Sequence, residues 1–104
     1  DGVEFTAVFA ANDMMAAGTM TALEEEGLRV PADVAVVGYD DINIASVMRP
    51  RLSTIAQPKY EMGWIAAETV TRRMSEPDGP RLEEVLQPVL VVRDSTVERR
   101  CASV

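Results

Sequence analysis

The sequence predicts an α/β fold with parallel strands and short loops. Apolar runs rich in β-forming residues alternate with stretches whose apolar residues recur at helical spacing, which indicates strand–helix–strand units. The apolar runs are continuous and do not alternate with polar residues, as expected for strands that are covered on both faces. Glycine and proline stand between the runs, where turns are needed.

The first half of the chain predicts one crossover unit. Residues 5–10 (FTAVFA) and 34–37 (VAVV) are the first two predicted strands, and residues 14–26 form the helix between them. Gly27 is expected to end that helix. The predicted buried face of the helix consists of Met15, Ala16, Thr19, Met20 and Leu23. A strand, a helix and a strand in this order are expected to make a right-handed connection.

The second half predicts two more strands and a second long helix. Residues 42–48 form a short helical or irregular stretch, and residues 52–56 (LSTIA) the third strand. Residues 59–74 predict the second helix. Its buried stripe is expected to be Met62, Ile65, Ala66, Thr69 and Val70. Residues 85–92 predict the last strand, and Pro88 inside it favours an edge or bulged strand because proline cannot donate to a sheet ladder.

The composition of the 104 residues excludes several classes of function. The chain has 17 acidic and 10 basic residues, a formal net charge of −7 and no histidine. An acidic surface repels phosphate backbones, so these residues are not expected to bind nucleic acid themselves. The lack of histidine removes the usual general base and the commonest neutral metal ligand. We therefore expect no metal, no cofactor and no catalysis.

The cysteine count and the hydropathy indicate the compartment. Cys101 is the one cysteine, which excludes an internal disulfide and fits a reducing compartment, and we expect its thiol to be exposed. No apolar run approaches the ~20 residues that a membrane-spanning helix needs. No signal segment opens the sequence. These features predict a cytoplasmic protein that does not contact the membrane.

Polar residues follow three of the predicted strands. Asn12 and Asp13 follow the first strand, Asp40 and Asp41 the second, and Gln57 the third. In open parallel sheets, ligands bind beyond the carboxyl ends of the strands. Carboxylates accept hydroxyl protons and amides both donate and accept, which suits a sugar-like or nucleoside-like polyol.

The same residues also have purely structural explanations. Asn12 and Asp13 can cap the helix, Asp40 can stabilise a turn, and Gln57 can lie on the surface. An enzyme with Asp40 and Asp41 as a magnesium-binding pair for phosphoryl transfer is a further alternative. Such a domain needs a lysine at another strand end, but the only lysine, Lys59, opens a helix. The spacing of the residues alone does not decide between a cap and a ligand site.

Four motifs resemble those of LacI/GalR transcription regulators, in the same order and spacing. They are AVFAANDMMAAG (residues 7–18), GLRVPADVAVVGYDDI (27–42), PRLSTIAQP (50–58) and VLVVRDST (89–96). The resemblance implies a type I periplasmic-binding-protein fold, in which two α/β lobes hold a small effector between them. By the same resemblance, Asn12, Asp40 and Gln57 contact the effector, Asp13 lies in the motif and Asp41 supports the site from behind.

The resemblance also implies how the chain is divided and what it lacks. Residues 1–56 and 93–104 are expected in the C-terminal lobe, and residues 57–92 in the N-terminal lobe. The fold is expected to be truncated, without the DNA-binding domain and much of the first lobe, so operator DNA would be contacted only through a domain outside these residues. Such regulators dimerise, and Ala17 and Met48 are the expected interface residues here. We also expect bare apolar faces to drive self-association.

Two functions fit this resemblance. The first is the sensing and dimerising portion of a transcription regulator, in which a sugar-like effector shifts lobe closure and the DNA affinity of the full-length protein. The second is a solute-binding protein of a sugar uptake system with the same fold. The sequences of residues 28–42 (LRVPADVAVVGYDDI) and 93–96 (RDST) favour the regulator.

Overall fold

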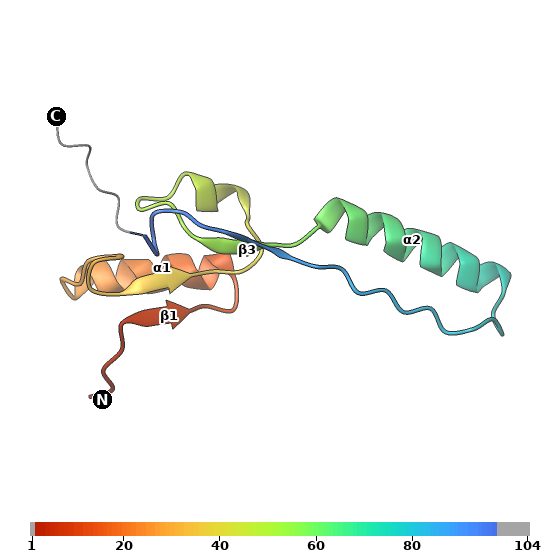
Figure 1. Cartoon of the computed structure of the whole chain (residues 1–104), viewed down its shortest axis with the longest axis horizontal. Coiled ribbons are helices and arrows are strands. Elements are labelled where there is room, and N and C mark those ends of the chain that lie inside the picture. The colour runs from red at the N-terminus through yellow and green to blue at the C-terminus, as the bar shows by residue number, and fades with distance from the viewer. Residues whose placement is uncertain (1, 98–104) are drawn as a thin grey trace. The chain divides into compact units, whose positions relative to one another are not determined.

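The computed structural model describes residues 2–97, which form two compact units. The first unit runs from the N-terminus to Ala56 and resumes at Val89, and the second is Gln57–Pro88. Figure 1 shows the first unit as strands covered by a helix, and the second as one helix followed by an extended return segment. The predicted assignment of residues to two lobes stays a prediction. Cys101 lies outside the described residues.

The first unit contains four short strands. They are β1 (Ala7–Phe9), β2 (Ala35–Val37), β3 (Thr54–Ala56) and β4 (Val89–Val91). β1 and β2 are parallel, with Val8 opposite Val36. β2 continues to β3 through the parallel bridges Val37–Ser53 and Asp40–Ala56. The predicted α/β fold with a parallel sheet is confirmed, although each strand is shorter than its apolar run.

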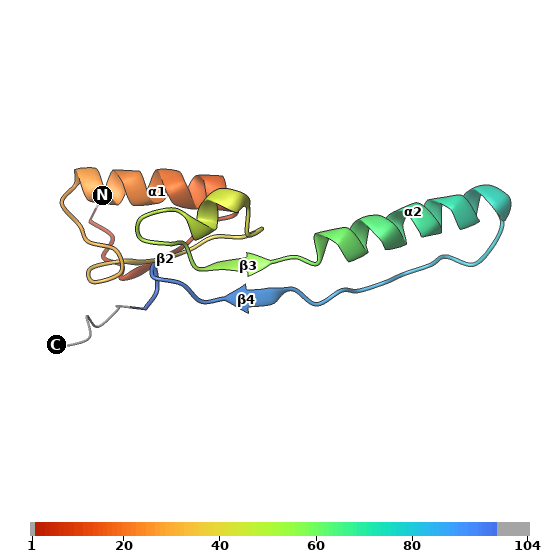
Figure 2. The same cartoon turned by 90° about the horizontal axis from the view of Figure 1, so that it is seen from above.

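β4 differs from the prediction in its start and its direction. It begins after Pro88 and not at residue 85, because proline has no N–H to donate to the neighbouring strand. It runs antiparallel to β3, with Leu90 opposite Ile55, and Figure 2 shows the two strands side by side. The chain thus leaves the sheet along β3 and returns along β4, so the last strand is not another parallel strand.

The helix α1 (Asp13–Glu25) has a defined start and end. The side-chain Oδ1 of Asn12 accepts a hydrogen bond from the backbone N–H of Met15 at 2.8 Å, which is the bond of an N-cap. Gly27 has a φ of +76°, the left-handed conformation that commonly follows a helix end. The prediction of a buried Met15 is wrong: its side chain is 56% exposed, whereas Asp13, which was not predicted on this face, is fully buried.

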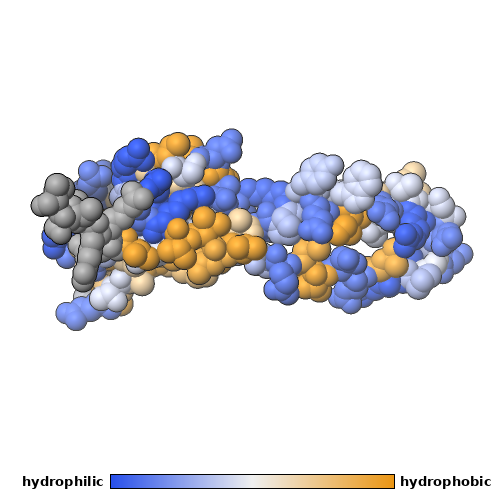
Figure 3. Space-filling model, turned by 45° about the horizontal axis from the view of Figure 1, so that its top comes forward, coloured by the Kyte–Doolittle hydropathy of each residue, from blue (hydrophilic) through white to orange (hydrophobic). Residues whose placement is uncertain are grey.

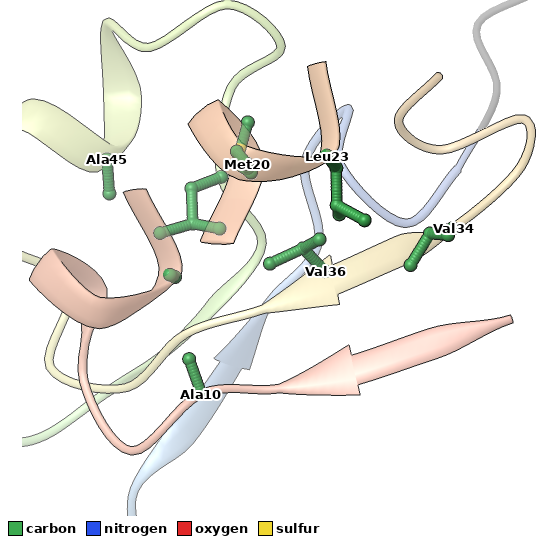
Figure 4. Close-up of a cluster of buried hydrophobic side chains, with 8 residues drawn as sticks. Ala10, Met20, Leu23, Val34, Val36 and Ala45 are labelled. Atoms are coloured by element: carbon green, nitrogen blue, oxygen red, sulfur yellow. The ribbon is translucent and has the colours of Figure 1, made fainter. Parts of the chain in front are cut away.

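The hydrophobic core of the first unit lies between α1 and the sheet. Its buried members are Ala10, Ala16, Met20, Leu23, Val34, Val36, Ala45 and Leu52. Figure 4 shows Met20 and Leu23 of α1 over Val36 of β2. The 3-10 helix η1 (Asn43–Ser46), which was predicted as a short helical stretch, adds Ala45 to this core. The core therefore holds the carboxyl ends of β1 and β2 against the start of α1.

The second unit has one helix, α2 (Lys59–Ser75), and no residue of that helix is buried. The predicted buried stripe is wrong for this chain: Ile65 and Thr69 are half-buried and the other three residues are exposed. Ile65 and Thr69 line a shallow hollow together with Leu82 of the return segment, which accounts for their partial burial. Figure 3 shows separate apolar patches among hydrophilic side chains in this part.

Within residues 2–97, no helix is long and apolar enough to cross a membrane.

Candidate functional site

The carboxyl ends of β1, β2 and β3 lie along one edge of the sheet, and four of the five predicted site residues meet there. The backbone N–H of Asp13 donates to the carbonyl of Tyr39 at 3.0 Å, which docks the start of α1 against the segment after β2. The backbone N–H of Asp40 donates to the carbonyl of Ile55 at 2.8 Å, which docks the same segment against β3. These main-chain bonds place Asn12, Asp13, Asp40 and Asp41 in one neighbourhood.

Asn12 is half-buried and its side chain already has one structural task. Its Oδ1 caps α1, as the structural explanation anticipated. The amide nitrogen of the same side chain is a donor on the other branch of the group. Asn12 therefore combines a cap with a donor at the edge of the sheet, and the two roles do not compete for the same atom.

Asp13 is fully buried, and its carboxylate joins three segments. Oδ1 accepts from the hydroxyl of Thr54 at 2.5 Å, and Oδ2 accepts from the backbone N–H of Ile42 at 2.8 Å. A buried carboxylate needs such donors because an unpaired charge in the interior is costly. Both oxygens are therefore engaged with the protein, and the geometry of Asp13 favours a structural role over contact with a ligand.

Gly38 allows this arrangement because it has no side chain. A Cβ at Gly38 would clash with Oδ1 of Asp13 and would lie 3.0 Å from Cδ2 of Leu52. Its backbone N–H donates to the carbonyl of Ser53 at 3.0 Å, so the strand cannot simply move away. Glycine is required here for close approach and not for an unusual φ.

Asp40 and Asp41 form a turn with two successive left-handed residues. Their φ angles are +115° and +57°, a region that side-chain-bearing residues seldom adopt, although aspartate tolerates it better than most. Oδ1 of Asp41 accepts from Nη1 of Arg93 at 2.8 Å, and both side chains are mostly buried. Asp41 is thus tied to the segment that follows β4, and its predicted supporting position behind Asp40 stays a prediction.

Gln57 follows β3 directly and is half-buried. Its neighbour in sequence, Ala56, forms the parallel bridge with Asp40. Gln57 is also the first residue of the second unit. The predicted interface residues are elsewhere in the first unit: Ala17 is half-buried on α1, and Met48 packs partly against the core.

Sequence reasoning missed the role of the segment that follows β4. Ser95 is fully buried, and its hydroxyl donates to the carbonyl of Val36 at 2.6 Å and accepts from the N–H of Ser53 at 2.8 Å. The hydroxyl of Ser53 is 2.6 Å from that of Thr96. The segment therefore bridges β2 and β3 with side-chain hydroxyls. One feature of the sequence could have indicated this role: Ser95 and Thr96 are adjacent hydroxyl-bearing residues in a segment that has no apolar periodicity.

The chemistry at this edge is that of hydrogen-bonding acceptors and amides. Residues 2–97 contain no cluster of three or more histidine, cysteine, aspartate or glutamate side chains that could hold a metal ion. Carboxylate and amide groups of this kind bind neutral hydroxyl groups, because each hydroxyl both donates and accepts.

The sequence model of the periplasmic binding protein-like domain matches residues 3–96. The chain belongs to this family. Among curated proteins, the ribose operon repressor of Haemophilus influenzae is 44% identical over 90 residues, which cover 86% of this chain and 27% of that repressor. The chain therefore spans about a quarter of the length of such relatives. The predicted resemblance to LacI/GalR regulators is confirmed.

Solved structures of LacI-type regulators also match the fold of this chain. A LacI family transcriptional regulator from Enterococcus faecium with bound ribose matches with a TM-score of 0.82 and 36% identity, over 94% of this chain and 37% of that one. The lac repressor dimer bound to operator and the anti-inducer ONPF matches with a TM-score of 0.82 and 38% identity, over 92% of this chain and 33% of that one. The fold and its likeness to regulators thus rest on both sequence and structure.

Proposed function

We propose that this chain is the effector-sensing portion of a LacI-type transcription regulator and that it binds a sugar or sugar-like molecule. The observation that carries the proposal is the meeting of Asn12 and Asp40 at the carboxyl edge of a parallel sheet. It is supported by the match to a regulator whose structure holds ribose. The names of the relatives favour a regulator over a solute-binding protein of an uptake system.

Each polar residue has a distinct part in this proposal. Asp40 accepts hydrogen bonds from sugar hydroxyls, Asn12 donates from its amide nitrogen, and Gln57 donates and accepts. Asp41 supports the turn through Arg93. This proposal includes no chemical step, so the chain acts in it as a binding module and not as an enzyme. The bound sugar acts by favouring one conformation of the whole protein over another.

The sugar alters operator affinity through dimer geometry in the full-length protein. Operator DNA is contacted by a domain outside these residues, because an acidic chain repels phosphates. A regulator that binds operator DNA works in the compartment that holds the DNA, so this proposal implies a cytoplasmic protein. Differential affinity of the sugar for two dimer arrangements is what transmits the signal.

The experiment is saturation-transfer NMR with D-ribose, with D-glucose and D-galactose as comparison sugars. Asp40→Asn removes the charge but keeps a side chain that tolerates positive φ. We expect it to weaken binding about tenfold, because asparagine keeps an acceptor oxygen and loses only the extra strength of a hydrogen bond to a charged group, about 1–1.5 kcal/mol. Asp78→Asn, in the exposed turn after α2, is the matched control and should leave binding unchanged. Absence of transfer to every sugar, or equal binding by Asp40→Asn, would contradict the proposal.

We further propose that the chain forms a homodimer through the faces that carry Ala17 and Met48. Met14 and Met15 on α1 are 64% and 56% exposed, which is apolar surface that association would cover. Light scattering at several concentrations tests this. We expect a dimer at low micromolar concentration in the wild type and dissociation by Ala17→Glu. A monomer at every concentration would refute the proposal.

A further inference from the structure

The turn at Asp40 and Asp41 needs an external constraint. Two successive residues other than glycine with φ of +115° and +57° are strained, and such a conformation persists only where the surroundings impose it. Main-chain bonds from Gly38 and Asp40 to β3 hold the turn on its N-terminal side. On the C-terminal side of the turn, the backbone N–H groups of Asp41 and Ile42 donate to side chains, namely the Thr54 hydroxyl and the Asp13 carboxylate.

Those side chains are Asp13 and Thr54, both of them fully buried. Oδ2 of Asp13 accepts from the N–H of Ile42 at 2.8 Å, and the Thr54 hydroxyl accepts from the N–H of Asp41 at 3.4 Å. The same hydroxyl donates to Oδ1 of Asp13 at 2.5 Å. A hydroxyl can donate and accept at once, so one carboxylate and one hydroxyl together serve two successive backbone amides.

We propose that Asp13 and Thr54 are positioning residues that hold the Asp40–Asp41 turn in the conformation that presents Asp40 to the ligand. The presentation of Asp40 to a ligand rests on the function proposed above, whereas the constraint on the turn does not. The constraint spans three segments that are distant in sequence: the start of α1, the end of β2 and β3. Asp13 acts through the turn and does not touch the ligand.

The close approach of Gly38 to Asp13 limits where the Asp13 carboxylate can lie. The Cα of Asp13 would lie only 3.2 Å from a Cβ at position 38, so the carboxylate is confined between β2 and β3. A confined carboxylate cannot follow a turn that moves. The confined carboxylate thus offers a fixed acceptor to the backbone N–H of Ile42, directly after the two residues with positive φ.

Amide hydrogen exchange on the 104-residue chain tests the constraint. Thr54→Val keeps the shape of the side chain and removes its hydroxyl. Exchange at Asp41 and Ile42 should then rise about ten- to a hundredfold relative to Ala10, whose N–H bonds to Val37 on the β1 side of the sheet. Thr54→Ser should restore the protection, since it restores the hydroxyl.

Ser53→Ala is the matched control. Ser53 is the adjacent residue and is 1% exposed, but its hydroxyl bonds to Arg93 and Thr96 and not to the turn. It should destabilise the unit without selective exchange at Asp41 and Ile42. If Thr54→Val raises exchange there no more than Ser53→Ala does, or if Thr54→Ser fails to restore protection, the positioning role is refuted.

A D-ribose titration of the same variants separates this inference from the proposed function. If Thr54→Val binds D-ribose more weakly and Ser53→Ala binds it as the wild type does, both the positioning role and the proposed sugar binding are supported. If the wild type binds no ribose, glucose or galactose but the exchange result holds, the positioning of the turn stands and the sugar ligand fails. If ribose binds and exchange at the turn is unchanged, the sugar ligand stands and the positioning role fails.

Discussion

Replacing Gly38 with alanine tests the close approach of β2 to the start of α1. The added Cβ would clash with Oδ1 of Asp13 and lie 3.0 Å from Cδ2 of Leu52. Both neighbours are fully buried, so neither can move into solvent. Overpacking of this kind costs about 1–3 kcal/mol, and a weakened hydrogen bond to a buried charge adds about 1.5–3 kcal/mol.

The two costs overlap because the same carboxylate is displaced in both. Loss of conformational freedom in the unfolded chain offsets about 0.4–1 kcal/mol. We therefore expect Gly38→Ala to lower the free energy of unfolding of the first unit by about 2–3 kcal/mol. Urea unfolding, followed through the amide NMR signals of the first unit, measures this change directly.

Gly18→Ala is the matched control for that experiment. Gly18 lies inside α1, and a Cβ there would meet nothing within 4 Å. Alanine is a better helix former than glycine, so this variant should be more stable than the wild type by about 0.5–1 kcal/mol. A Gly38→Ala protein with unchanged stability, or stabilised to the same extent as Gly18→Ala, would show that Asp13 is not confined as described.

Two further predictions concern the core and a surface turn. Leu52 is fully buried, so Leu52→Ala should cost about 2–5 kcal/mol in urea unfolding, whereas Val70→Ala, at an exposed position of α2, should change stability by less than about 0.5 kcal/mol. Bonds from the backbone and side chain of Arg29 lower the pKa of Asp33 below 3.8. Their stabilisation of the turn is thus complete above that pH and lost as pH falls through the lower folded-state value. The Arg29 amide signal should follow this loss in an acid titration, and a pH-independent signal would contradict it.

The order of elements could be predicted from the sequence because local signals mark each of them. Asn12 and Gly27 mark the two ends of α1, and continuous apolar runs mark β1 and β2. The edge that gathers Asn12 and Asp40 then follows from the rule that parallel strands end at a common edge. Local pattern and tertiary structure agree in these parts of the chain.

The buried polar network could not be predicted from local pattern. Asp13 and Thr54 are 41 residues apart, and Ser95 and Val36 are 59 residues apart, so no helical or strand period relates them. The burial of α2 was mispredicted for a related reason. Its apolar spacing indicates a face that suits packing, but spacing does not say whether the partner for that face is within the chain.

The most direct test of the central claim is chemical-shift mapping of the isotope-labelled chain during titration with D-ribose. We expect saturable shifts at Asn12, Asp40 and Asp41, and none at the turn of Arg29 and Asp33, which is held by its own local bonds. Shifts confined to other surfaces, or no shifts at any strand end with ribose, glucose or galactose, would contradict the claim that this edge of the sheet binds a sugar.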